Sequence, residues 1–109
     1  MKYQLADIVV IDFPFSDLTG SKKRPALVIS NIKGDNCILC QITSKKSKID
    51  DYQTLILKEI QSTNLSVNSY VRSDLLFTLS KSLILGKIGN IDEVSLGKVK
   101  QKIAKVFEL

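Results

Sequence analysis

Histidine and tryptophan are both absent from this 109-residue sequence. Without histidine, the chain lacks the commonest general base, the commonest metal ligand and the partner of Ser–His and Cys–His dyads. Cys37 and Cys40 have the spacing of a redox motif. They fall within an expected strand, where residues three apart point to opposite faces, so they cannot share a zinc ion. We therefore expect two core thiols and no metal site.

Long apolar runs are also absent, and none approaches the roughly 18–20 residues that cross a bilayer. The N-terminal stretch MKYQLADIVVIDF is interrupted by Asp7 and Asp12 and has no small-residue cleavage site, which argues against a signal peptide. We expect a cytoplasmic protein whose cysteines stay reduced.

The overall composition is that of a globular chain, with 44% hydrophobic and 25% charged residues. A length of 109 residues suits a single domain over residues 1–109. The net charge of +5 favours an acidic partner, of which a nucleic acid is the commonest. Charge alone is equally compatible with a merely basic protein.

Short apolar runs separated by polar segments predict a mainly β fold. The expected strands are Asp7–Phe15, Arg24–Asn31, Cys37–Thr43, Gln53–Lys58, Ser69–Phe77 and Ser82–Ile88. The expected loops and turns are Ser16–Lys23, Ile32–Asn36, Ser44–Asp51 and Ser62–Asn68, the last with room for a short helical piece. After residue 90, apolar residues recur every three or four positions, which predicts a C-terminal helix with Asp92 and Glu93 at its positive end. This order suggests a small, strongly curved antiparallel barrel.

Three polar positions stand within or at the ends of these strands. Arg24 precedes Pro25, which holds it extended, and its planar guanidinium matches a phosphate. Thr43 ends an apolar strand, and Arg72 and Asp74 share one strand face. Each has a plain structural interpretation: a solvated strand end, a good strand residue, and a surface ion pair worth about 0–1 kcal/mol. Only their combination would indicate a site.

The order of these motifs resembles the PemK/MazF family of bacterial toxin ribonucleases. The stretch DIVVIDFPFSDLTGSKKRPALVIS (residues 7–30) is similar to the family's opening, with an acidic residue, an apolar strand, a glycine-containing loop and an Arg-Pro strand. Cys40–Ser44 resembles the third strand, which ends in an active-site hydroxyl residue. Val71–Asp74 is similar to a later Arg-x-Asp segment, and Leu83–Leu109 completes the pattern. The resemblance covers essentially the whole chain.

This resemblance implies a mainly β, SH3-like antiparallel barrel with a C-terminal helix. It also implies a homodimer, without metal or other cofactor, that cuts single-stranded RNA to a 2′,3′-cyclic phosphate and a 5′-hydroxyl. A cognate antitoxin would be its protein partner. By position, Arg24 matches the family's catalytic arginine and Thr43 its catalytic threonine. Arg72 and Asp74 match residues that some members use.

Two departures from the family pattern affect these expectations. Ala6 stands where a glycine usually precedes the first acidic residue, and we expect little change from it. Some members use a histidine after the first strand, so here the acid and base roles fall on other groups. Asp74 is the only carboxylate near the motifs and is our candidate base, with Arg72 orienting it or holding a flanking phosphate.

If the chain binds RNA, the cationic residues of two loops would form a rim that contacts its phosphates. The candidate RNA-binding residues are Lys22, Lys23, Ser44, Lys45, Lys46, Lys48 and Phe15. Phe13, Phe15 or Tyr70 could stack an unpaired base, although core packing is the favoured role for the phenylalanines. Two alternatives stay open: a nucleic-acid-binding barrel without catalysis, and a gyrase-directed toxin of the same fold.

Overall fold

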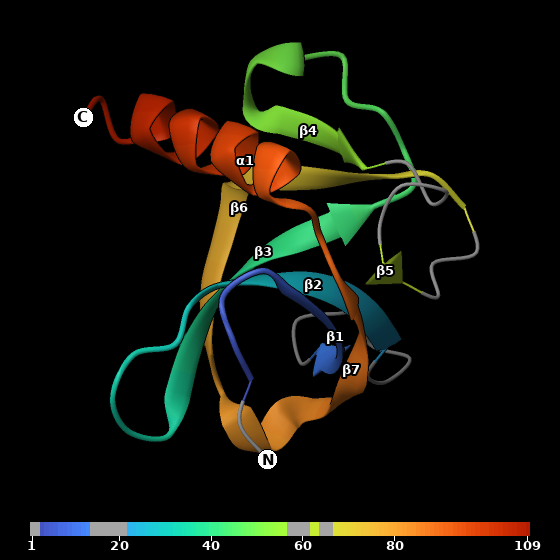
Figure 1. Ribbon diagram of the computed structural model, residues 1–109, viewed down its shortest axis with the longest axis vertical. Helices are drawn as coiled ribbons and strands as arrows, with labels where there is room; N and C mark the ends of the chain where they lie inside the picture. Colours follow the sequence, from blue (N-terminus) through green and yellow to red (C-terminus); the bar gives the residue numbers. More distant parts are fainter. Residues whose placement is uncertain (1–2, 14–21, 57–61, 64–66) are drawn as a thin grey trace.

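The computed structural model of the protein describes residues 3–13, 22–56, 62–63 and 67–109 (Figure 1). Its strands are β1 (Asp7–Phe13), β2 (Lys22–Ser30), β3 (Asn36–Thr43), β4 (Gln53–Ile56), β5 (Ser62–Thr63), β6 (Ser69–Ser80) and β7 (Ile84–Asn90). Two 3-10 turns, η1 (Asp50–Tyr52) and η2 (Lys81–Leu83), and one helix, α1 (Glu93–Val106), complete the described elements. Within these residues, no helix has the length and apolar character needed to cross a membrane.

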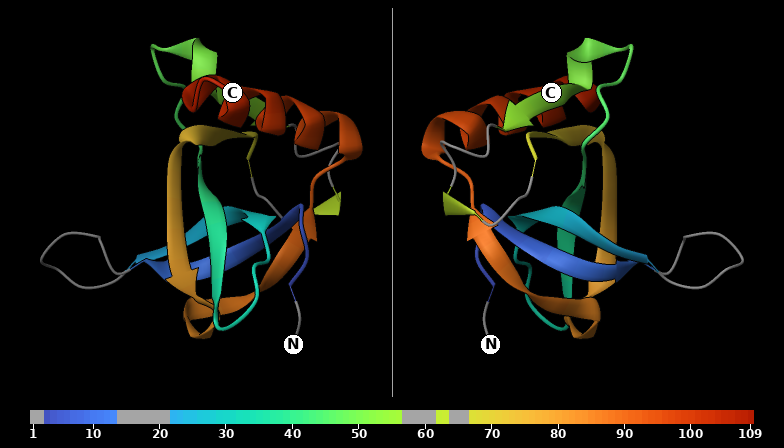
Figure 2. Two further views of the ribbon diagram at one scale, coloured as in Figure 1. Left: turned by 90° about the vertical axis from the view of Figure 1, so that its left-hand side faces the viewer. Right: turned by 90° about the vertical axis from the view of Figure 1, so that its right-hand side faces the viewer.

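The strands form one antiparallel sheet in the order β4-β6-β3-β2-β1-β7-β5. The predicted fold class, mainly β with a C-terminal helix, is confirmed. The sheet curls strongly, so that the paired strands β1 and β2 cross the direction of β3 and β6 (Figure 2). It is not closed into a hydrogen-bonded barrel, because β4 and β5 remain its two ends in the part of the chain described.

All six expected strands are present, with bounds that differ by a few residues. The prediction of a turn at the start of Ser62–Asn68 is wrong, because Ser62 and Thr63 form β5 and pair with Asn90 and Gly89 of β7. Such a two-residue strand satisfies backbone groups at a sheet edge without any apolar pattern that sequence could reveal. The predicted ends of the first and fourth strands lie outside the described residues.

A break in register bends β6 next to the candidate site. Cys40 of β3 pairs with Leu76, whereas the next residue, Gln41, pairs with Arg72, so residues 73–75 have no counterpart on β3. Figure 2 shows β6 turning here from a segment beneath α1 to one that runs beside β3. Bulges of this kind re-aim side chains. This bulge contains Asp74.

Two apolar clusters lie on opposite faces of the sheet. The first, between β1, β2, β3, β6 and β7, includes Val9, Ile11, Ala26, Val28, Cys37, Leu39, Leu79 and Ile84. The second, which we call the helix-facing core, includes Ile8, Leu27, Cys40, Ile42, Ile56, Val71, Ile91 and Val99. Cys37 and Cys40 are both buried and belong to different clusters, so the prediction of two core thiols on opposite faces is confirmed. Burial, and secondarily Asp74, raises the pKa of Cys40 to about 12, which makes its thiol inert at neutral pH.

Helix α1 covers the helix-facing core and packs on β4 and β6 (Figure 1). Its expected acidic start is confirmed, because the Asp92 side chain accepts a hydrogen bond from the backbone N–H of Ser95 at 3.2 Å. Val99 is fully buried, and its carbonyl accepts a hydrogen bond from the Ser73 hydroxyl at 3.2 Å. The helix is therefore fixed directly to the bulge of β6.

Ala6 has a strained backbone, with φ of 78° in the left-handed region that favours glycine. Its N–H donates to the Val28 carbonyl at 2.9 Å, and its own carbonyl accepts from Ile91 at 3.0 Å. These bonds hold the residue in place. Alanine at this position therefore has a cost in backbone strain that glycine would not have, and the sequence did not reveal it.

Substitutions at Ala6 should follow this backbone constraint. We expect Ala6→Val to lower the free energy of unfolding by about 1–3 kcal/mol, since β-branched residues tolerate positive φ poorly. Ala6→Gly should stay within about 0.5 kcal/mol of wild type, because relief of strain is offset by greater freedom of the unfolded chain. Urea denaturation measures both, and equal stabilities of the valine and glycine variants would contradict the strain.

Candidate functional site

Polar side chains lie where the paired strands β2 and β3 end. In β2 and β3, Ala26 pairs with Gln41 and Leu27 with Cys40. Arg24 comes two residues before Ala26 and Thr43 two residues after Gln41, so both lie at the same end of the β2–β3 pair. Thr43 in turn pairs with Tyr70 of β6. Directly opposite residues have Cβ atoms about 4.5–5.5 Å apart, so Thr43 and Tyr70 form a row across these two strands.

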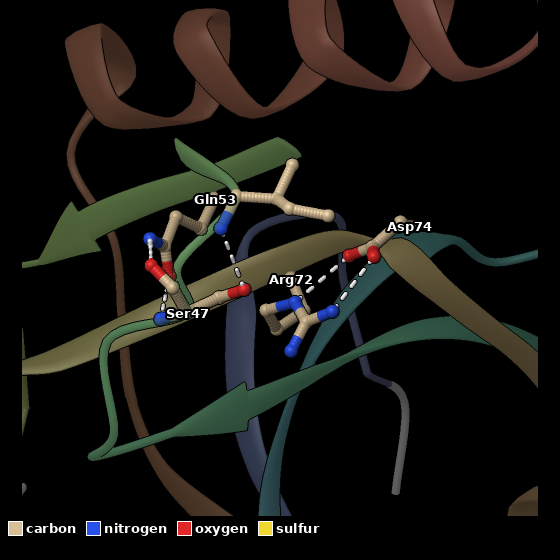
Figure 3. Close-up of polar contacts among 5 residues, drawn as sticks. Ser47, Gln53, Arg72 and Asp74 are labelled. Atoms are coloured by element: carbon tan, nitrogen blue, oxygen red, sulfur yellow. Dashed lines mark hydrogen bonds and ion pairs between the residues drawn. The ribbon is translucent and has the colours of Figure 1, made fainter. Parts of the chain in front are cut away.

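A second row lies next to the first on the same face. Arg72 pairs with Gln41 on one side and with Gln53 of β4 on the other. Because Ile42 and Val71 point into the helix-facing core, their neighbours Thr43 and Arg72 point to the opposite face. Figure 3 shows Arg72 on the side of β6 away from α1. The sheet therefore brings the predicted Arg24, Thr43 and Arg72 onto one face.

Arg24 is exposed at the beginning of β2 and pairs with Ile11 of β1. It makes no hydrogen bond or ion pair with another described residue. Pro25 limits the backbone of Arg24 to extended geometry, which agrees with its place in the strand. The strand thus holds the backbone of a residue whose side chain is a permanently charged fork of donors.

The Thr43 hydroxyl has a defined orientation. Its Oγ1 accepts a hydrogen bond from the backbone N–H of Lys45 at 3.2 Å. A hydroxyl that accepts in this way still has its own proton to donate. Thr43 is therefore suited to donate to an anion that lies over the row.

Arg72 and Asp74 form a bidentate ion pair along β6 (Figure 3). The Arg72 Nε lies 2.9 Å from Asp74 Oδ1, and Nη2 lies 2.7 Å from Oδ2. The hydrogen bonds from Arg72 lower the pKa of the Asp74 carboxyl below its ordinary value, and those same bonds raise the pKa of Arg72. Asp74 is consequently ionised at neutral pH.

The loop after β3 is braced by Gln53, which sequence reasoning did not single out. The Gln53 amide accepts from the Ser47 backbone N–H at 3.0 Å and donates to the Ser47 carbonyl at 3.1 Å (Figure 3). Ser47 Oγ in turn accepts from the N–H of Ile49 at 3.2 Å. The one available signal in the sequence was a glutamine at the start of the expected strand Gln53–Lys58, and its burial became known only from the structure. The brace holds the segment that carries Lys45, Lys46 and Lys48.

Loss of this brace should destabilise the protein. We expect Gln53→Ala to lower the free energy of unfolding by about 1–3 kcal/mol, because two hydrogen bonds are lost at a buried position. The matched control is Ser47→Ala, which keeps both main-chain bonds to Gln53 and should cost less. Chemical denaturation tests the difference. Equal costs for the two variants would contradict a bracing role.

The remaining predicted RNA-binding residues are distributed around the rows. Ser44, Lys45, Lys46 and Lys48 are exposed in the braced loop, and Lys23 is exposed beside Arg24 in β2. Phe15 and the Lys22 side chain lie outside the described residues, as does the Phe13 side chain. In the part of the chain described, no three cysteine or carboxylate side chains gather into a group able to hold a metal ion.

Comparison with known proteins shows the family. Residues 4–107 match the family model for the PemK-like, MazF-like toxin of type II toxin-antitoxin systems. The chain belongs to this toxin family. The sequence-based recognition of the PemK/MazF family is thereby confirmed. A sequence search of curated proteins finds no match.

Solved structures of MazF toxins share the fold. A mycobacterial endoribonuclease solved with its cognate antitoxin has a TM-score of 0.77 at 17% identity, covering 99% of this chain and 97% of that one. MazE-MazF from Deinococcus radiodurans gives a TM-score of 0.77 at 18% identity, covering 98% of this chain and 97% of the other. MazF alone from Deinococcus radiodurans gives a TM-score of 0.76 at 20% identity, covering 100% of this chain and 99% of the other. At these identities the likeness establishes the PemK/MazF-like fold of the chain.

Proposed function

We propose that this chain is a sequence-specific endoribonuclease toxin that cleaves single-stranded RNA without a metal ion. The observation that carries the proposal is the register that places Arg24 and Thr43 at the same end of the β2–β3 pair, with the Arg72–Asp74 pair on the neighbouring strand. Membership of the toxin family supports it. The site would hold a phosphate among cationic and hydroxyl donors beside one carboxylate.

RNA supplies its own nucleophile in this proposal, the 2′-hydroxyl beside the scissile phosphate. The O2′–P bond forms, the P–O5′ bond breaks, and the products are a 2′,3′-cyclic phosphate and a 5′-hydroxyl. Arg24 and Thr43 donate hydrogen bonds to the non-bridging oxygens, where negative charge grows. Arg24 stays protonated throughout and stabilises the departing 5′-oxygen until it takes up a proton from water.

Asp74 is the proposed base that accepts the 2′-hydroxyl proton. Its lowered pKa keeps it ionised, but both its oxygens are engaged by Arg72. An incoming phosphate would compete for the Arg72 guanidinium, which would release the carboxylate toward the nucleophile. Arg72 therefore has a positioning role in the proposal and contacts a flanking phosphate.

The cationic rim would follow the RNA backbone. The residues that we propose for this rim are Lys22, Lys23, Ser44, Lys45, Lys46 and Lys48, with Phe15 beside them. Each phosphate neutralised by a lysine makes binding weaker as salt rises. The net charge of +5 supports a polyanionic ligand.

We also propose a homodimer, in which a second copy covers an apolar groove of about 350 Å³. The groove is lined by Ile29, Ser30, Ile38, Leu76, Phe77, Thr78, Ile103 and Phe107. The side chain of Phe107 is 58% exposed there. Static light scattering should give a dimer for wild type and a monomer for Phe107→Asp. A monomeric wild type at tens of micromolar would contradict the proposed dimer.

A cognate antitoxin is the proposed protein partner, and the cytoplasm is the proposed compartment. An acidic antitoxin segment would compete with RNA for Arg24 and the loop lysines. Two of the three solved structures compared above contain an antitoxin, one mycobacterial and one from Deinococcus radiodurans. Buried Cys37 and Cys40 agree with a reducing compartment.

The test is incubation of the purified protein with mixed-sequence single-stranded RNA in EDTA. Cleavage that leaves cyclic-phosphate and 5′-hydroxyl ends supports the proposal. RNA that is bound but intact would point instead to a binding module without catalysis. A parallel supercoiling assay with gyrase distinguishes the ribonuclease from the gyrase-directed alternative. A gyrase-directed toxin would inhibit supercoiling and leave RNA intact.

A further inference from the structure

A pocket of about 370 Å³ opens beside the candidate site, and the roles given above assign nothing to the pocket itself, although its residues Lys46 and Gln53 belong to the rim and the brace. Its lining residues come from separate parts of the chain: Lys46 from the braced loop, Gln53 and Leu55 from β4, Tyr70 from β6 and Lys102 from α1. The helix thus contributes to the same face of the protein as the braced loop. Its lysine was not among the residues that the sequence indicated.

The pocket begins one strand away from Thr43. Tyr70 pairs with Thr43 on one side and with Leu55 on the other. Thr43, Tyr70 and Leu55 therefore form a row across three strands that leads into the pocket. Neighbouring strands are about 4.7–4.9 Å apart, so a group in the pocket lies within one nucleotide's reach of a phosphate held over Thr43.

The lining combines two kinds of chemistry. Tyr70 and Leu55 offer an aromatic and an aliphatic surface, and Leu55 is 46% exposed. Lys46 and Lys102 bring two ammonium groups. The Lys102 Nζ donates to the Gln53 carbonyl, which fixes its position, and an ammonium has two further protons to donate.

We propose that this pocket binds the nucleotide next to the scissile phosphate. Its base stacks on Tyr70 against Leu55, and its phosphate is held by Lys46 and Lys102. The inference rests on the proposed function, because it takes the phosphate over Arg24 and Thr43 as its reference point. Base stacking on aromatic side chains with lysines on the backbone is the general way in which proteins hold single strands.

The experiment measures binding of two fluorescein-labelled ligands that the protein cannot cleave. One is a mixed-sequence 2′-O-methyl ten-mer, and the other is the same sugar-phosphate chain without bases. Tyr70→Leu should weaken binding of the intact ten-mer by about 5- to 150-fold, the range for one stacked base, and change binding of the abasic chain by less than about two-fold. Thermal melting verifies that each variant is folded.

Lys102→Gln should weaken binding of both ligands and reduce the slope of log affinity against log salt by about one. The matched control is Lys100→Gln, which removes the same charge from an exposed position about 200° around the helix. It should change neither affinity by more than about two-fold.

Two results would overturn the proposed subsite. Tyr70→Leu could weaken both ligands equally or neither, or Lys102→Gln could behave like Lys100→Gln. A protein that binds as described but cleaves no RNA refutes the proposed function alone. One that cleaves RNA with no role for Tyr70 refutes the subsite alone.

Discussion

Replacing Arg24 with alanine is expected to lower RNA cleavage by about 10³- to 10⁵-fold, the range for an arginine that stabilises charge on a transferring phosphoryl group. The fold should persist, because the side chain is exposed and substitutions at such positions usually change stability by no more than about 0.5 kcal/mol. Single-turnover cleavage rates and urea denaturation, measured on the same preparation, separate the two effects.

Variants at Thr43 and controls elsewhere refine this prediction. Thr43→Ala should lower cleavage by about 10²- to 10³-fold, the cost of one lost donor, whereas Thr43→Ser keeps the hydroxyl and should retain most activity. Arg24→Lys keeps the charge but loses the planar fork and should remain impaired. Lys33→Gln removes a charge from the exposed turn between β2 and β3 and should cleave as wild type does. Wild-type rates for Arg24→Ala would show that the site lies elsewhere.

Asp74→Asn is expected to lower cleavage by about 10²- to 10⁴-fold, because it removes the proposed general base while preserving shape. The same change should cost only about 0.5–1 kcal/mol of stability, since the Arg72 and Asp74 side chains are 24% and 28% exposed. A large loss of rate with a small loss of stability distinguishes a catalytic carboxylate from a structural ion pair. Full activity of Asp74→Asn would refute the base assignment.

The pH dependence of Asp74 has a definite sign. Its pKa is lower in the folded protein than its ordinary value, so the ion pair contributes stability above about pH 4 and loses it as pH falls through the folded-state pKa. The stability difference between wild type and Asp74→Asn should therefore close in acid. Because Asp74 is already ionised, kcat/KM should show no ascending limb between about pH 6 and 9. Such a limb at neutral pH would indicate another base.

The strands and the helix were predictable because their patterns are local. Apolar and β-branched runs mark β1 to β4 and β6, and the three-to-four period marks α1 with its acidic start at Asp92. The short strand β5 was missed because two polar residues at a sheet edge carry no apolar signal. The bulge in β6 was also missed, since it depends on how β3 and β6 match along their length.

For the candidate site, the sequence indicated which residues take part but not how the fold places them. Sequence motifs indicated Arg24, Thr43, Arg72 and Asp74, but not that the register brings Arg24 and Thr43 to the same end of the β2–β3 pair and sets Arg72 opposite Gln41. Gln53 and Lys102 were missed because their roles come from contacts between distant segments. The strain at Ala6 was invisible for the same reason, since hydrogen bonds to Val28 and Ile91 impose it. Pairing across strands, rather than local composition, determines these features.

Attack by the RNA's own 2′-hydroxyl is the central claim, and one substrate tests it most directly. Once a cleaved linkage is mapped, an RNA oligonucleotide is made in which only the nucleotide on the 5′ side of that linkage carries 2′-deoxyribose. The protein should bind this oligonucleotide and leave the linkage intact in EDTA while it cuts the unmodified strand. Cleavage of the modified linkage at an undiminished rate would mean that water or a protein group attacks the phosphate, and the proposed mechanism would be wrong.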